Sequence, residues 1–95
     1  MTVETRLFDP TRYLDSDEAI AGFMEEAFET GDATFITHAL GIAARARGMT
    51  QIAKDAGLSR ESLYRALGEN GNPEFATVLK VAKALGLRLT TVAAE

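Results

Sequence analysis

Apolar residues recur at intervals of three and four along most of the chain, which is the spacing of helices that pack on a core. Polar capping residues and glycines divide this pattern into five predicted helices. Asp15 with Glu18 resembles a capping box, and the pair Asn72-Pro73 is typical of a helix start. The predicted helices cover about 16–30, Asp32 to Gly48, Thr50 to Ala56, Ser59 to about Leu67, and Pro73 to Gly86.

The chain end departs from this helical pattern. Residues 87–93, LRLTTVA, alternate in polarity and are rich in β-branched side chains, so they predict one short strand. A lone strand is not stable, and its partner is expected to be residues 3–8 or the same strand of a second subunit. The predicted fold class is therefore all-α with a short C-terminal β-strand. Four phenylalanines fall on predicted inner helix faces and are expected in the core: Phe23, Phe28, Phe35 and Phe75.

The middle of the chain has the pattern of a helix-turn-helix. Ala53 is the small residue needed where two helices cross closely, and Gly57, four residues later, suits a turn with positive φ. The residues expected on the buried side are Ile52, Ala56, Leu58, Leu63 and Ala66. The residues expected to face outward from the second helix are Ser59, Arg60, Glu61, Ser62, Tyr64 and Arg65. Two ordinary packed helices with a solvated outer face are the alternative interpretation.

The outward side chains have the chemistry of DNA recognition in the major groove. Arg60 or Arg65 can bond O6 and N7 of a guanine, and Glu61 can accept from a cytosine amine. Tyr64 offers a hydroxyl to a phosphate or a ring edge to a thymine methyl. The polar loop 68–73 supplies two further candidates for phosphate contact, Asn70 and Asn72.

Charge is distributed unevenly along the chain. Residues 1–32 carry nine acids against two bases, a net of −7, whereas residues 33–95 carry eight bases against five acids, a net of +3. An acidic arm on a basic body suggests two partners of opposite charge, although the acids could equally solvate one helix face. With only about +3 of charge, one copy is expected to bind DNA weakly, so a homodimer reading a palindrome is expected.

Several other classes of protein are disfavoured. The 95 residues are enough for one domain, and the absence of cysteine and of a long apolar run predicts a cytoplasmic protein without a membrane segment. His38 is expected to be a partly exposed helix residue rather than a ligand. The acid pairs Glu25-Glu26 and Asp17-Glu18 lack a convergent nucleophile, so no enzyme is predicted. No metal-ligand cluster and no cofactor site are expected.

Residues 35–89 resemble a known family, most distinctively in ARARGMTQIA, GLSRESLYRAL and GNPEFATVLKVAKALG. They are similar to the HigA-like antitoxins, the antidote proteins of addiction modules that carry a phage-repressor-type helix-turn-helix. Residues 8–32 look like the acidic leader of that family. The resemblance implies a five-helix phage-repressor-like fold, a dimer that binds its own operator, and a basic RelE/HigB-like toxin as partner. It also makes Gln51 a candidate for a phosphate contact.

One domain, 1–95, is expected to have three parts. Residues 1–31 form the acidic arm with the first helix, 33–86 form the DNA-binding core, and 87–93 form the terminal strand. The predicted function is an antitoxin that represses its own operon and uses the acidic arm against the toxin. A free-standing repressor without a toxin, and a protein-interaction module that has lost DNA binding, are the alternatives.

Overall fold

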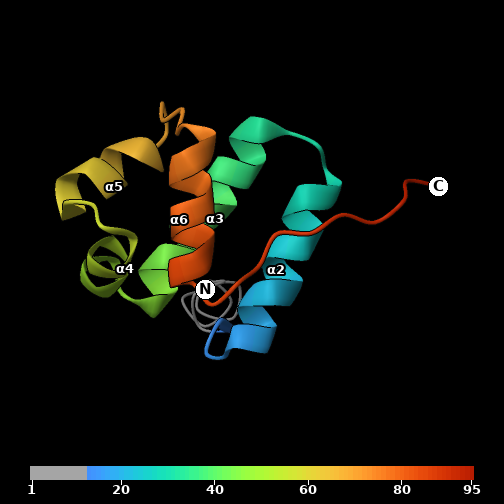
Figure 1. Cartoon of the computed structure of the whole chain (residues 1–95), viewed down its shortest axis with the longest axis horizontal. Helices are drawn as coiled ribbons and strands as arrows, with labels where there is room; N and C mark the ends of the chain where they lie inside the picture. The colour runs from blue at the N-terminus through green and yellow to red at the C-terminus, as the bar shows by residue number, and fades with distance from the viewer. Residues whose placement is uncertain (1–12) are drawn as a thin grey trace, which may run out of the picture.

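Five helices make up the regular structure of residues 13–95, the part of the chain that the computed structural model describes. The prediction of an all-α fold is confirmed for these residues. The helices are α2 (Asp17–Glu29), α3 (Ala33–Arg47), α4 (Met49–Ala56), α5 (Arg60–Ala66) and α6 (Phe75–Ala84) (Figure 1).

The helices are arranged around α3, with α6 packed across its front in the view of Figure 1. The helix α2 packs against α3 on one side, and α4 and α5 lie together on the other side, where α4 also packs against α6. This arrangement leaves α5 at the edge of the molecule, far from α2 in the view. The acidic helix α2 and the predicted DNA-binding helix α5 therefore lie on opposite sides of α3.

The core is formed mostly by small and medium-sized apolar residues. Ile20, Ala43, Leu63 and Val81 have no exposed surface, and each comes from a different helix. Alanines on α3 let the other helices approach closely. At Gly41 even a Cβ would lie 3.1 Å from the carbonyl oxygen of Leu67, so this glycine permits the close contact between α3 and the end of α5.

Three of the four phenylalanines predicted in the core are not there. Phe28, Phe35 and Phe75 are 39%, 50% and 70% exposed, and only Phe23 is half-buried against the core. On α6 the buried side chains are Val81 and Ala82, with Leu85 just after the helix, so Phe75 lies one turn before the part of α6 that meets the core. Helical spacing predicts that these rings lie on the buried faces of their helices. The buried face of each helix includes fewer residues than the spacing predicts.

Two of the predicted helix caps are confirmed. Asp32 accepts from the backbone N–H of Phe35 at 3.2 Å, and Ser59 accepts from the N–H of Ser62 at 3.0 Å. Each bond satisfies one of the backbone donors that a helix start leaves unpaired.

The other predicted starts are wrong by one or two residues. Ser16, not Asp15, caps α2, because its hydroxyl accepts from the N–H of Ala19 at 3.1 Å. Thr50 is not a cap, since α4 already begins at Met49 and no side chain caps it. Glu74 rather than Asn72 precedes α6, so Asn72 belongs to the loop.

The predicted C-terminal strand is also wrong. Residues 87–95 have neither helical nor strand structure, and in Figure 1 they cross in front of α2 before running clear of it. An extended segment becomes a strand only when a neighbouring backbone completes its hydrogen-bond ladder. Residues 3–8, one of the two predicted partners, lie outside the described residues.

Candidate nucleic-acid interface

The turn between α4 and α5 has the geometry that the helix-turn-helix pattern predicts. Gly57 adopts φ 74°, and its N–H bonds to the carbonyl of Lys54 at 3.1 Å. The N–H of Leu58 bonds to the carbonyl of Ala53 at 2.9 Å. These two bonds form a Schellman motif, which ends α4 sharply and directs the chain into α5.

The buried side of this unit agrees with the prediction at nearly every position. Ile52, Ala53, Ala56 and Leu63 are buried, and Leu58 and Ala66 are half-buried. Packing between α4 and α5 fixes the orientation of α5 on the body of the protein. The outer side of α5 is therefore presented as a rigid surface.

Four of the predicted recognition residues on α5 are exposed together: Arg60, Glu61, Tyr64 and Arg65. The two serines differ, because their polar groups serve the helix start. The Ser59 hydroxyl caps the helix and also donates to the Ser62 hydroxyl at 2.8 Å. Ser62 itself is half-buried. The two arginines, Glu61 and Tyr64 therefore form the exposed surface of α5, and the two serines stabilise the start of the helix.

Arg60 and Tyr64 hold each other one turn apart on α5. The guanidinium carbon of Arg60 lies 5.3 Å from the centre of the Tyr64 ring, and Nη2 donates to the tyrosine hydroxyl at 3.4 Å. A cation over an aromatic face is attractive, by about 0.5–1 kcal/mol at exposed sites. The contact limits the rotamers of both side chains before any ligand arrives.

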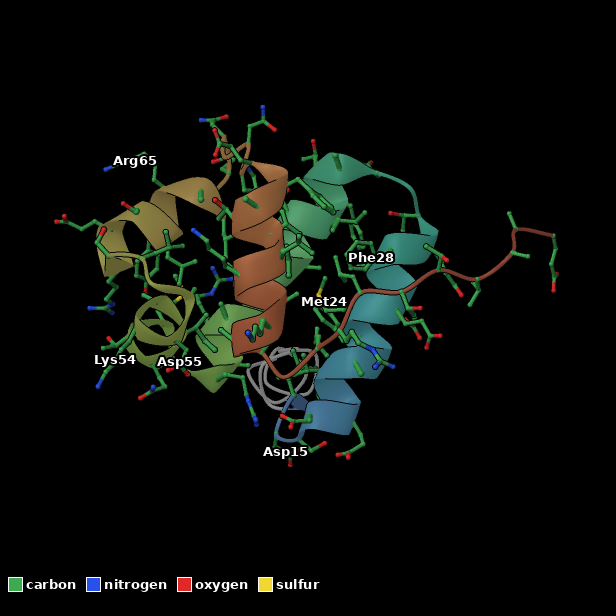
Figure 2. The ribbon with its side chains drawn as sticks, in the orientation of Figure 1. Asp15, Met24, Phe28, Lys54, Asp55 and Arg65 are labelled. Atoms are coloured by element: carbon green, nitrogen blue, oxygen red, sulfur yellow. The ribbon has the colours of Figure 1, made fainter. Side chains whose placement is uncertain are left out.

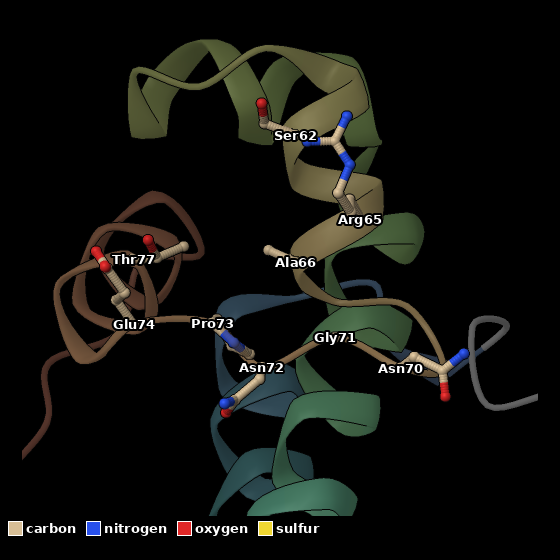
Figure 3. Close-up of a pocket in the computed structure, with 9 residues that line it drawn as sticks. All are labelled: Ser62, Arg65, Ala66, Asn70, Gly71, Asn72, Pro73, Glu74 and Thr77. Carbon is tan, nitrogen blue, oxygen red and sulfur yellow. The ribbon is translucent and has the colours of Figure 1, made fainter.

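Arg65 forms one border of an open groove of about 340 Å³ between the end of α5 and the start of α6. Figure 3 shows Asn72 across the groove from Arg65, and Asn70 farther along the loop. The structure therefore brings these three predicted residues together. Gly71 makes the loop possible, because a Cβ there would lie only 2.1 Å from the carbonyl oxygen of Ala66.

Gln51, the remaining predicted residue, lies exposed on the first turn of α4. Its amide nitrogen Nε2 donates to the carboxylate of Asp55 at 2.9 Å, one turn along the same helix. A phosphate contact through this amide would have to compete with that hydrogen bond.

The positive charge of residues 33–95 is not concentrated on the helix-turn-helix. Residues 49–74, which include α4, α5 and the loop, carry three bases against four acids, a net of −1. The other bases of the body lie outside the motif, on α3, α6 and the C-terminal segment. Arg47 is paired with Asp17 of α2 at 2.6 Å. Attraction of a polyanion to this surface would rest on individual arginines rather than on net charge.

A second groove carries basic residues that sequence reasoning did not single out. Lys54 of α4 and Lys80 and Lys83 of α6 border a space of about 510 Å³ together with Asp55. Figure 2 shows Lys54 and Asp55 at the outer edge of α4. Lys54 is 26 residues before Lys80 and 29 before Lys83, so only the packing of α4 on α6 brings it beside them.

Other classes of site find no support among residues 13–95. No group of three or more histidine, cysteine, aspartate or glutamate side chains there could hold a metal ion. None of the helices in this part of the chain is long and apolar enough to cross a membrane. His38 is exposed on α3.

Comparison with known proteins gives two positive findings. A family model described as "Probable addiction module antidote protein" matches residues 4–93. A protein of Haemophilus influenzae that carries the description "Uncharacterized protein" is 50% identical over 88 residues, which cover 93% of this chain and 91% of that protein. No solved structure matches the chain.

Proposed function

We propose that this chain, which belongs to the addiction module antidote protein family, is a cytoplasmic DNA-binding antitoxin that represses its own operon. An antidote implies a toxin, and the family description names no enzyme. The proposal adds two finer statements. As a homodimer, the protein binds a palindromic operator through α5, and it neutralises a basic RelE/HigB-like toxin through its acidic arm.

The observation that carries the DNA-binding proposal is the exposed set of side chains on α5. Arg60, Glu61, Tyr64 and Arg65 all project from one short helix whose inner side is fixed by the buried Leu63. Such a helix fits the major groove, where arginine reads guanine and glutamate accepts from cytosine. The groove beside Arg65 adds the amides of Asn70 and Asn72, which suit phosphate oxygens of the same strand.

A salt series of binding to the DNA upstream of the gene tests this proposal. We expect tight binding that weakens steeply with salt, and far weaker binding to scrambled DNA of equal length. Arg65→Ala should lower affinity for the upstream DNA by about 1–3 kcal/mol, the value of one good arginine contact. Arg88→Ala removes the same charge from the exposed C-terminal segment and serves as the control. Equal, weak binding to both DNAs would refute operator recognition.

The acidic side of α2 is the proposed toxin contact. Glu18, Glu25 and Glu29 are exposed and recur at intervals of seven and four, so they share one face of the helix. The helix α2 lies on the opposite side of α3 from α5 (Figure 1). One molecule could therefore present a negative surface to a basic toxin while α5 stays on DNA.

Charge removal tests the toxin contact better than truncation does. Deleting residues 1–30 would also remove Ile20, Met24 and Ala27 from the core and so unfold the protein. Changing Glu18, Glu25 and Glu29 together to glutamine keeps the fold and removes three charges. We expect weaker binding to the toxin encoded beside the gene, and a loss of growth rescue on co-expression. Changing Glu69, Glu74 and Glu95 to glutamine is the matched control, and equal effects of the two triple variants would contradict a specific contact.

The net charge of the motif favours one alternative function. Residues 49–74 sum to −1, which is unusual for a surface that binds a polyanion and fits a protein-interaction module that has lost DNA binding. Under that alternative, Arg60→Ala and Arg65→Ala would leave DNA binding at its feeble starting level. Toxin binding through α2 would be retained.

A further inference from the structure

The outer face of α6 carries the most exposed aromatic ring among residues 13–95. Phe75 is 70% exposed, and Leu79, one turn later on the same side of the helix, is 42% exposed. Ala76 between them is exposed as well. A phenylalanine side chain has roughly 150–250 Å² of surface to bury, so leaving most of it in water is costly unless another surface covers it.

The second half of the same face is basic. Lys80 and Lys83 are exposed and follow Leu79 by one and four residues. From its first to its last turn, the outer face of α6 thus changes from apolar to positively charged, with Leu79 at the boundary. The buried side of the helix holds Val81 and Ala82, where α6 packs on α3 and α4.

We propose that this face of α6 is the dimer interface, and that it packs against the α6 of a second copy in antiparallel orientation about a twofold axis at Leu79. The inference rests on the homodimer of the proposed function and names its surface. A twofold interface must be self-complementary. If one residue of the first copy contacts a second residue of the other copy, the same contact is repeated with the two copies exchanged.

The sequence of α6 meets that condition. With Leu79 on the axis, Leu79 meets its own copy, and Phe75, four residues before it, meets the copy of Lys83, four residues after it. A lysine lays its aliphatic stem along an apolar surface and places its ammonium group over an aromatic ring. Each dimer would contain two such Phe75–Lys83 contacts on either side of one apolar centre. A parallel arrangement would instead place lysine against lysine.

The position of α6 in the fold fits a dimer that binds DNA. In Figure 1, α6 lies in front of α3, and α4 and α5 lie to one side of α6. If the twofold axis is perpendicular to α6 and points toward α5, the α5 helices of both copies lie on the same side of the dimer. Two recognition helices on one side are what a palindromic operator requires, with half-sites about 34 Å apart. Two copies also double the number of arginines that can bond directly to the operator, which matters because the net charge of −1 of each motif gives no long-range attraction.

The interface is small, so association should be weak without DNA. The helix α6 has ten residues and is about 15 Å long, which buries less area than standard stable interfaces do. We expect the apparent mass to rise from 10.2 kDa toward twice that value with increasing concentration in sedimentation equilibrium. These measurements contain no DNA and no toxin, so they do not depend on whether α5 binds an operator.

Charge substitutions at the axis test the orientation. Leu79→Glu and Leu79→Lys each place two like charges against each other, so each variant alone should stay monomeric. An equimolar mixture should regain the dimer, because Glu then meets Lys across the axis. Leu79 is exposed, so neither change should unfold the monomer, which circular dichroism can verify. A mixture that stays monomeric, or single variants that still dimerise, would overturn the proposal.

Cross-linking gives an independent test because the chain contains no cysteine. Leu79→Cys introduces one thiol at the proposed axis, where its copy would lie within disulfide reach, at a Cα separation of about 4.4–6.8 Å. In a redox buffer most of this variant should become a covalent dimer. Ala21→Cys, which exposes a thiol on α2, should form much less. Equal cross-linking of the two variants, or a wild-type chain that is monomeric at every concentration, would exclude this face as the interface and leave it to a partner of different sequence.

Discussion

A glycine in the middle of a helix and a glycine in a tight loop should respond to alanine with opposite signs. Gly22 lies in the middle of α2, and a Cβ added there would meet nothing within 4 Å. Alanine at an exposed helix position stabilises by about 0.5–1 kcal/mol relative to glycine, because the unfolded chain has less freedom to lose. For a domain of this size that gain raises the melting temperature by about 2–8 °C.

Gly71 should show the reverse. A Cβ there would lie 2.1 Å from the carbonyl oxygen of Ala66, whereas ordinary contacts begin at 3.4 Å, so the loop or the end of α5 must move by 1.3 Å. The obstructing atoms are backbone and cannot rotate away. Forcing extra volume into a packed site costs about 1–3 kcal/mol, which lowers the melting temperature by several degrees or more.

Urea denaturation followed by circular dichroism measures both variants against the wild type. Gly22→Ala is the internal control, since it makes the same chemical change where space is available. A second effect should separate them. Gly71→Ala displaces the loop that holds Asn70 and Asn72 beside Arg65, so it should also weaken operator binding. If Gly71→Ala proved as stable as the wild type, the steric account of the loop would be refuted.

Three further predictions concern the supports of α5 and α2. Leu63→Ala should lower the free energy of unfolding by about 3–5 kcal/mol in urea denaturation, because it leaves a cavity under the fully buried side of α5; a loss below 1 kcal/mol would contradict that burial. Ser59→Ala should lower the free energy of unfolding by about 1 kcal/mol because the helix loses its cap, and Ser62→Ala should lower it by less. A larger loss for Ser62→Ala than for Ser59→Ala in the same assay would show that Ser59 is not the cap. Asp17→Asn should cost under about 1 kcal/mol, since its bridge to Arg47 is exposed, and the difference in melting temperature should shrink in 1 M salt.

The sequence was sufficient to predict the five helices and the turn between α4 and α5, because these depend on local chemistry. Gly57 adopts positive φ, and Asp32 and Ser59 each accept from the backbone N–H three residues ahead. The errors at helix starts arise where neighbouring residues have equal capping chemistry. Asp15 and Ser16 both offer an oxygen, and only the path of the chain decides which one accepts.

The parts that could not be predicted depend on contacts between distant segments. Helical periodicity placed Phe75 on an inner face, but where α6 leaves the core depends on α3 and α4, which periodicity does not describe. The groove beside Arg65 needs the tight loop at Gly71, whose role becomes visible only when the carbonyl of Ala66 is located. The lysines of α4 and α6 border one groove only because α4 packs on α6, which the sequence pattern does not show.

The charge of the motif connects these observations to function. A single copy presents Arg60 and Arg65 from α5 within a region of net charge −1, so long-range attraction adds little to its affinity for DNA. Under the proposed function, affinity for the operator would then come from directed hydrogen bonds and from two copies on one operator. The proposed dimer would account for one feature that is costly for a monomer, the exposed Phe75 on α6. Loss of the dimer through Leu79 should therefore weaken operator binding far more than the loss of any single arginine, since it removes half of all contacts at once.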